Sequence, residues 1–421
     1  MSIATPPGTG EIIADGARRT SGRLAALGTA LLVLMPLAMW LANRSAPLVF
    51  GLAAGCFVAA AIVAEGWRPF RWRLLGRLRD PLGLSLCAFV VWSLVTLAWS
   101  GRPIQGLGAW GELVLPLACG LAIASSGRLR PGIGADRALA LALIVAAAFM
   151  MAELASHLSL RIMLGIGKQQ GFVFNRPALT CLVLSAAVLP GLLRLGAWPR
   201  DHLLAGVLLL VLIALAFDSD SGAAGFGLAI MAVIWLAALA WPRLTFSAVA
   251  LAFAATMLLS PVMGRLVDAI LPPSLHERLA ESHSRERMEI WLSFGEAILA
   301  RPLLGSGFAA SATLDRHPVA LAVSPPHRAM LAVGHPHSAP MQAWVETGAI
   351  GAALLAFAGL AFLSRMRHLP ARELAPRLAL AASAFAIACV AHGAWQGWWI
   401  ATLAAGTVWL CAGSSRCERD G

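Results

Sequence analysis

Long apolar stretches alternate with short polar connections along almost the whole chain. A membrane-crossing helix needs about 20 mostly apolar residues, and with that window the sequence predicts about twelve such helices. The predicted spans cover residues 24–42, 47–65, 82–99, 105–126, 137–157, 172–193, 202–217, 222–241, 244–263, 342–364, 375–392 and 395–412. One connection, residues 264–341, is far longer than the others. The pattern therefore predicts an all-α polytopic membrane protein with one large loop that contains short helices.

Arginines are distributed unevenly over the short connections. About 20 of them fall on the side of the membrane that also holds both termini, whereas the opposite short loops hold Arg44, Arg102, Arg161 and Lys168. Because cytoplasmic loops carry the excess of basic residues, both termini are predicted to be cytoplasmic and the long loop periplasmic. The predicted domains are a cytoplasmic N-terminal arm 1–23, nine spans in 24–263, the periplasmic loop 264–341, three spans in 342–412 and a cytoplasmic tail 413–421. The polar start of the arm, residues 1–17, is expected to be disordered.

Composition narrows the class of protein. Hydrophobic residues make up 59% of the 421 residues and charged residues 13%, with a mean hydropathy of +0.77. Soluble domains have about a quarter of their residues charged, so a soluble enzyme and a disordered chain are excluded. The net charge of +11 would suggest nucleic acid as the partner of a soluble protein. Here the membrane topology accounts for most of the arginines, and the expected partner is the lipid bilayer rather than nucleic acid.

The long loop differs in composition from the rest of the chain. A helix with one apolar face is predicted for residues 274–300, and Arg301-Pro302 should end it. The glycine-rich stretch 304–308 predicts a tight turn. A second segment, 334–340, contains His335 and His337 and leads directly into the predicted span 342–364.

His337 is the strongest candidate for chemistry in this loop. A histidine at the mouth of a helix bundle, on a water-accessible side, can act as a general base near neutral pH. The alternative is a histidine that only hydrogen-bonds the loop. A metal site is a second alternative, because His335 and His337 would point the same way in an extended segment, with His317, His327 or Glu346 as a third ligand. No i, i+4 histidine pair, carboxylate cluster or CxxC pair accompanies them, so no metal and no cofactor is predicted.

Arg176 is a charged residue at the outer end of the predicted span 172–193. Such a residue usually faces a polar cavity. Pro177 fits the first turn of a helix, which places Arg176 at a helix N-terminus, where the dipole attracts an anion. A guanidinium suits phosphate because it donates two parallel hydrogen bonds. The alternative is an arginine that snorkels to the outer boundary. His392 and Gln396 could line the same cavity.

Four motifs follow one another in and after the long loop. They are Arg287-Met-Glu-Ile-Trp291, Arg301-Pro-Leu-Leu-Gly-Ser-Gly-Phe308, His335-Pro-His337-Ser, and Gln342-Ala-Trp-Val-Glu346-Thr-Gly348. In order and spacing they resemble the signature region of the O-antigen ligase and O-antigen polymerase superfamily, whose members are polytopic proteins with one large periplasmic loop. Two departures are Ser338, where the family often has Asn, and Ser221-Gly222-Ala223, where the family often has an arginine.

The resemblance implies an enzyme of the bacterial inner membrane with a periplasmic active site. It would transfer O-antigen polysaccharide from undecaprenyl pyrophosphate to a sugar hydroxyl of lipid A–core, with inversion and without a metal. In this chain His337 would be the general base, and Arg176 and Arg287 would hold the pyrophosphate. Arg265 and Arg285 are further candidates for the pyrophosphate, and His335, Gln342 and Glu346 would hold the acceptor or orient His337.

Two alternatives stay open at this stage. An O-antigen polymerase of the same superfamily shares the donor and differs in the acceptor, so the motifs do not separate it from the ligase. A polytopic transporter or flippase could instead use Arg176 and the outer cavity. The glycan structure, the acceptor position and the oligomeric state have no signal in the sequence.

Overall fold

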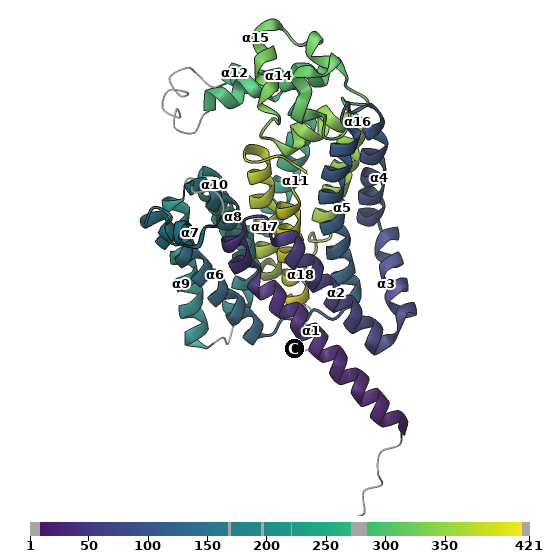
Figure 1. Ribbon diagram of the computed structural model, residues 1–421, viewed down its shortest axis with the longest axis vertical. Coiled ribbons are helices and arrows are strands. Elements are labelled where there is room, and N and C mark those ends of the chain that lie inside the picture. The colour runs from purple at the N-terminus through teal and green to yellow at the C-terminus, as the bar shows by residue number, and fades with distance from the viewer. Residues whose placement is uncertain (1–8, 167–169, 195–197, 220, 271–283, 415–421) are drawn as a thin grey trace, which may run out of the picture. The chain divides into compact units, whose positions relative to one another are not determined.

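The computed structural model describes residues 9–166, 170–194, 198–219, 221–270 and 284–414 (Figure 1). All regular elements in these ranges are α-helices or short 3-10 helices, labelled η. By its internal contacts the chain falls into two compact units. Unit 1 comprises Met1–Arg77, Leu115–Leu215 and Trp398–Gly421, and unit 2 comprises Leu78–Val114 and Ala216–Gly397.

The described residues contain eleven helices that are long and apolar enough to cross a membrane. The prediction of an all-α polytopic membrane protein is therefore confirmed. These helices are α1 (Thr9–Leu41), α2 (Ala46–Glu65), α4 (Pro81–Thr96, extended by η1, Leu97–Trp99), α5 (Pro103–Ser126), α6 (Ile133–Ala155), α8 (Asn175–Leu192), α9 (Pro199–Asp218), α10 (Gly222–Ala240), α11 (Pro242–Leu259), α16 (Ala339–Ser364) and α17 (Ala371–Val390). The twelfth predicted span, 395–412, corresponds to the shorter helix α18 (Gly397–Ser414), because the residues before Gly397 form an irregular loop.

The N-terminal arm is more ordered than the sequence predicts. The expectation of disorder is wrong for residues 9–17, which belong to the continuous helix α1, while residues 1–8 lie outside the described ranges. An ion pair of 2.7 Å joins Asp15 and Arg19 at i, i+4 spacing and supports the exposed part of α1. Polar composition alone therefore does not make this arm irregular.

Short helices occupy the connections. In unit 1 these are α3 (Trp67–Arg79, which runs on into unit 2), α7 (Ser159–Leu164) and η2 (Gly171–Phe174). In unit 2, η3 (Ser260–Val262) directly follows α11. The short helices of the long loop are α12 (Met263–Ile270), α14 (Ser284–Ala300), η5 (Ala310–Arg316), η6 (Pro318–Ala322), α15 (Pro325–Arg328) and η7 (Ala329–Val333). The helix predicted over 274–300 is confirmed over 284–300 as α14 and ends before Arg301, while 274–283 lies outside the described residues.

The long loop of unit 2 folds around a hydrophobic core of its own. Phe294 and Ile298 of α14 are buried against Leu314 and Leu331 of the 3-10 helices and against Val345 of α16. Figure 1 shows α12, α14 and α15 gathered at one end of α4 and α16. The described part of the loop after residue 283 is therefore a folded cap that is continuous with α16.

The helix α16 is interrupted one third of the way along its length. Gly348 has φ 65° and ψ −171°, a conformation that glycine adopts and other residues avoid. The interruption releases backbone groups that would otherwise pair within the helix. Because a bilayer core supplies no water to satisfy them, they must find partners in the protein.

Two segments supply these partners. The N–H groups of Ser306 and Gly307 donate to the carbonyls of Val345 and Glu346, at 2.7 and 2.9 Å. Nearby, the Ala349 N–H donates to the Pro302 carbonyl at 2.8 Å, and the indole Nε1–H of Trp92 in α4 donates to the Thr347 carbonyl at 2.8 Å. The segment 302–307, which overlaps the tight turn predicted over 304–308, is therefore docked along the interrupted helix.

Glycines make this docking sterically feasible. Gly305 has φ 68°, and a Cβ there would lie 2.6 Å from the Gly348 nitrogen. A Cβ on Gly348 would lie 2.7 Å from the Gly305 nitrogen and nearer still to the Leu303 carbonyl. Real Cβ contacts are longer than this, so neither position accepts a side chain without displacing backbone.

We expect Gly348→Ala to destabilise the protein by roughly 2–6 kcal/mol, the sum of backbone strain and overpacking. The measurement is the apparent melting temperature of the purified protein in detergent. The matched control is Gly225→Ala, in helix α10, where an added Cβ would meet nothing within 4 Å. That variant should keep or raise the melting temperature, since alanine favours a helix by up to about 1 kcal/mol. Equal melting temperatures for Gly348→Ala and wild type would refute the proposed constraint.

Candidate active site

His337 lies in the loop between η7 and α16, in unit 2, and is half-buried. Its φ of 50° is in the left-handed region, which is uncommon for a side chain of this size and is often found at functional sites. Its Nδ1 lies 2.6 Å from the Ala391 carbonyl oxygen. A carbonyl accepts, so Nδ1 carries the proton and Nε2 is the nitrogen that can take up another.

His335 packs against His337, with the two ring centroids 4.1 Å apart and the rings edge-on. The Nδ1 of His335 accepts the His337 backbone N–H at 3.3 Å. Burial, with contributions from His337 and His392, lowers the pKa of His335 to about 4. His335 is therefore neutral at neutral pH, and the tautomer set by its Nδ1 contact presents an Nε2–H donor.

Helix α14 brings Arg287 into the electrostatic environment of His337. The indole Nε1–H of Trp291 donates to the Pro336 carbonyl at 3.0 Å, which fixes α14 against the histidine segment. Arg287 lies four residues earlier on the same helix, about one turn away. Burial lowers the pKa of Arg287, but a guanidinium starts so high that it stays charged at neutral pH.

The pKa of His337 is lowered from its usual value. Burial is the main cause, the hydrogen bond to Ala391 opposes it, and the positive charge of Arg287 lowers the pKa further. His337 is consequently in its neutral, proton-accepting form at neutral pH.

Two side chains of α16 hold the loop that carries Ala391. Gln342 donates from Nε2 to Glu346 Oε1 at 2.9 Å, and its Oε1 accepts the Ala394 N–H at 2.9 Å. Glu346 is fully buried, and its Oε2 accepts from the Ala309 N–H at 2.8 Å and from Trp395 Nε1 at 2.6 Å. Of the two roles predicted for this pair, these contacts favour orienting His337 through the loop over holding an acceptor sugar.

The loop 391–396 is the part of the site that the sequence located least well. Trp395 stacks on Phe308 at 5.1 Å and tilts against Phe89 at 5.6 Å, so it joins the docked segment to α4. Sequence reasoning assigned no role to Trp395 or to the Ala391 carbonyl. The available signal was their position beside His392 and Gln396, which the sequence predicts to line the cavity of Arg176. In the structure, a Cβ on Gly393 would lie within 4.0 Å of His335, Gln342 and Gln396.

The other predicted arginines of unit 2 are placed differently from Arg287. Arg285 is two residues away on α14, which puts it on the opposite face, and it forms an exposed ion pair of 3.4 Å with Glu289. Arg265 is exposed on α12, next to Gly264, which packs closely against the backbone of Trp291 and Leu292. Among these three arginines, Arg287 is the one whose charge acts on His337.

Arg176 belongs to unit 1. It is in the first turn of α8, with Pro177 beside it as the sequence predicts, and its guanidinium carbon lies 5.6 Å from the ring centroid of Trp398. The stretch before it is held by Arg161, which stacks over Phe174 at 4.8 Å. The helix behind it is buried over almost its whole length. Arg176 therefore stands on a rigid support, at a helix end with a positive dipole.

A Ser-His-Glu group elsewhere in the loop has a different geometry from a hydrolytic triad. Ser324 Oγ and Glu296 Oε1 both approach the same nitrogen of His327, Nδ1, at 3.1 and 2.8 Å. A triad needs the serine and the acid on opposite nitrogens of the imidazole. The group therefore fastens α15 to α14. Within the described ranges, no three His, Cys, Asp or Glu side chains are grouped as metal ligands.

Comparison with known proteins supports the resemblance drawn from the motifs. Residues 205–356 match the family model described as "O-Antigen ligase", and this region contains Arg287, His335, His337, Gln342 and Glu346. A protein of Rickettsia felis named "Putative polysaccharide ligase" is 23% identical over 361 residues, which cover 80% of this chain and 83% of that protein. A protein of Rickettsia conorii of the same description is 23% identical over 332 residues, 75% of each chain. The resemblance to O-antigen ligases is thus confirmed.

We expect Glu346→Gln to lower the stability of unit 2 by about 1–3 kcal/mol, the cost of an unsatisfied buried donor. A glutamine amide has one oxygen, whereas Glu346 accepts from donors on both of its oxygens. The measurement is the apparent melting temperature in detergent. The control Glu289→Gln, which removes an exposed ion pair, should change stability by less than about 1 kcal/mol. Equal effects of the two substitutions would contradict the role of Glu346.

Proposed function

From the likeness to O-antigen ligases, we propose that this protein transfers O-antigen polysaccharide from undecaprenyl pyrophosphate to a sugar hydroxyl of lipid A–core. The observation that carries the proposal is the state of His337. Its Nδ1–H is committed to the Ala391 carbonyl, so Nε2 can accept a proton, and the charged Arg287 acts on the same ring. A base beside a cation suits the transfer of a group away from an anionic carrier.

The proposed reaction is a single displacement. The acceptor hydroxyl attacks the anomeric carbon of the glycan while His337 Nε2 takes its proton, and the bond from that carbon to the pyrophosphate oxygen breaks. The configuration at the carbon is inverted, and undecaprenyl pyrophosphate leaves with the bonding electron pair. Arg287 stabilises the negative charge that develops on the leaving group, so no metal ion is required for that purpose. Arg176 is proposed as a further phosphate contact, because it combines a guanidinium with a helix N-terminus.

The proposed setting is the bacterial inner membrane. The arginine distribution supports cytoplasmic termini and a periplasmic active site. The cap formed by the long loop would then face the compartment in which a lipid-linked glycan and lipid A–core can meet. Exposed leucines and phenylalanines on the spans, such as Leu210 and Phe357, are suited to contact with lipid tails.

The test is reconstitution of the full-length protein in vesicles with the polyprenyl-linked glycan and lipid A–core. We expect glycosylated lipid A–core as the product, with the same yield in the presence of EDTA. His337→Ala should lower the rate roughly 100- to 10,000-fold, as expected for loss of a general base. The control His368→Ala, an exposed histidine after α16, should retain the wild-type rate.

The pH profile gives the same assay a second readout. Because the pKa of His337 lies below 6.5 and the neutral form is the base, the acid limb of kcat/KM should fall below pH 6.5. A limb at or above 6.5, or equal rates for His337→Ala and wild type, would overturn the base assignment. Activity lost with EDTA and restored by a divalent ion would overturn the metal-free mechanism.

Deletion of the gene should leave lipid A–core bare while polymerised glycan accumulates on its carrier, whereas absence of polymerised glycan would identify a polymerase.

Arginine geometry should matter at position 287 and not at position 285. We expect Arg287→Lys to lower turnover at least about tenfold, since lysine keeps the charge and loses the two parallel hydrogen bonds. Arg285→Lys, on the opposite face of α14, should keep turnover within about twofold. Turnover by both variants is measured in the vesicle assay. An unchanged rate for Arg287→Lys would exclude bidentate phosphate contact at that residue.

A further inference from the structure

Helix α3 is a basic helix that adjoins two membrane-spanning helices. It follows α2 directly after Gly66, whose φ of 82° turns the chain, and it ends just before α4. Its sequence, WRPFRWRLLGRLR, contains five arginines and two tryptophans. Since a span ends at Glu65 and the next begins at Pro81, α3 is confined to the boundary of the bilayer.

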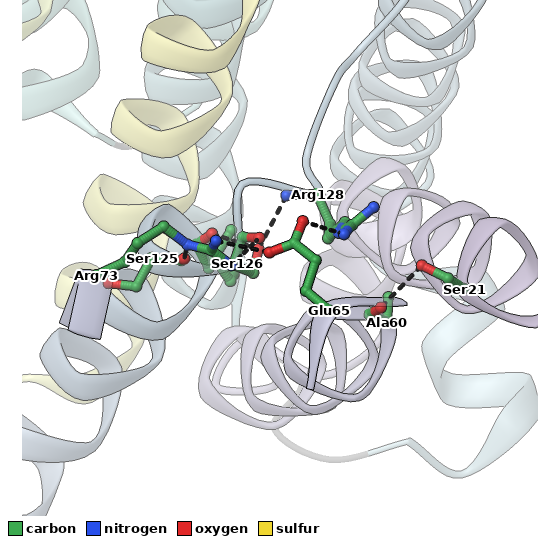
Figure 2. Close-up of polar contacts among 8 residues, drawn as sticks. Ser21, Ala60, Glu65, Arg73, Ser125, Ser126 and Arg128 are labelled. Carbon is green, nitrogen blue, oxygen red and sulfur yellow. Dashed lines mark hydrogen bonds and ion pairs between the residues drawn. The ribbon is translucent and has the colours of Figure 1, made fainter. Parts of the chain in front are cut away.

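One face of α3 is anchored to unit 1. Phe70 is buried there, and Arg73 donates from Nε to the Ser125 carbonyl at 2.8 Å and from Nη2 to the Ser126 carbonyl at 3.3 Å (Figure 2). Arg77, one turn later, donates to the Ala124 carbonyl at 3.1 Å. These carbonyls are at the C-terminal end of α5, which lacks intrahelical donors and carries the negative end of the dipole.

A carboxylate completes the anchor. Glu65, the last residue of α2, accepts from Arg73 Nη1 at 2.6 Å and pairs with Arg128 on its other oxygen. Figure 2 shows Glu65 between these two arginines, with Ser125 and Ser126 beside Arg73. Arg73 thus bridges the ends of α2 and α5. Contacts on three sides fix the rotation of α3 about its own axis.

The fixed rotation exposes a second pair of arginines. Arg68 and Arg71 are three residues apart and therefore share a face, which differs from the anchored face of Phe70, Arg73 and Arg77. Both are exposed, and no ion pair within the described chain involves either of them. Trp67 and Trp72 flank them with 53% and 58% of their surface exposed, and the Arg71 guanidinium lies 5.6 Å from the Trp72 ring centroid.

We propose that this exposed face of α3, formed by Trp67, Arg68, Arg71 and Trp72, binds the headgroups of anionic phospholipids. Arginine guanidinium groups bind phosphate through paired hydrogen bonds, and tryptophan is the residue that settles at the headgroup level of a bilayer. An anionic leaflet attracts basic segments beside a span. Arg73 and Arg77 form hydrogen bonds within the protein, whereas Arg68 and Arg71 are exposed and can contact lipid headgroups.

The test is titration of full-length protein in detergent micelles with phosphatidylglycerol, with the bound lipid counted by native mass spectrometry. Each arginine near an anionic surface contributes about fivefold to binding, so Arg68→Gln/Arg71→Gln should bind phosphatidylglycerol about 25-fold more weakly. Phosphatidylcholine binding should be the same for this variant and wild type. Arg68→Lys/Arg71→Lys, which keeps the charge and loses the paired hydrogen bonds, should have an affinity between those of the glutamine variant and wild type.

The matched control is Arg44→Gln/Arg316→Gln. Both arginines are exposed, and both lie in connections predicted to face the periplasm, on the side of the membrane opposite to α3. The control removes the same charge and should bind phosphatidylglycerol within twofold of wild type. An equal loss in the control, or an unchanged affinity of the Arg68/Arg71 glutamine variant, would overturn the proposal.

Two measurements on the wild-type protein keep the proposal testable if the glutamine variant does not fold. Binding of phosphatidylglycerol should weaken as salt rises, because exposed charges are screened, and salt-independent binding would refute the proposal. Inorganic phosphate at millimolar concentration should not displace the lipid. Displacement by phosphate would show a site for a soluble anion instead of a headgroup surface.

Discussion

The interruption of α16 at Gly348 is the constraint on which the site in unit 2 depends. Carbonyls that a continuous helix would pair internally are turned toward the segment 302–307 and toward Trp92, and each is satisfied there. A membrane interior tolerates an irregular backbone when protein covers it in this way. The cap is consequently registered on α16 by backbone hydrogen bonds, which fix position more strictly than apolar contact alone.

The same contacts extend to the surroundings of His337, the proposed base. Glu346 accepts hydrogen bonds from Ala309, just after the docked segment, and from Trp395 in the loop 391–396. Gln342 accepts a hydrogen bond from Ala394 in the same loop. The same loop presents the Ala391 carbonyl that selects the tautomer of His337. Glu346 thus contacts the loop whose Ala391 carbonyl pairs with His337, and it does so without touching the imidazole. Trp291 provides the complementary support from α14.

Sequence reasoning was strongest where one physical rule acts on each residue separately. Hydropathy predicted the spans because lipid penalises every polar group, and Arg301-Pro302 and the glycines at 305 and 307 predicted the helix end and the turn from local backbone preference. It failed for residues 9–17, which continue the helix α1 despite their polar composition. The sequence also does not predict hydrogen bonds between distant residues, such as Trp92 and Thr347, which are 255 residues apart, because such pairs leave no periodic pattern. The roles of Arg287, His337 and Arg176 stay predictions that geometry supports.

The order in which the chain is synthesised decides which hydrogen-bond partners of α16 are present when this helix inserts. During synthesis α4 and residues 302–307 emerge before α16, so partners for the released carbonyls already exist when that helix enters the bilayer. The partners of Gln342 and Glu346 at Ala394 and Trp395 emerge only afterwards. His337, the proposed base, is therefore aligned last, once α17 and the loop 391–396 have been synthesised. A chain truncated before that loop would contain most of the spans and would lack the Ala391 carbonyl that orients the proposed base.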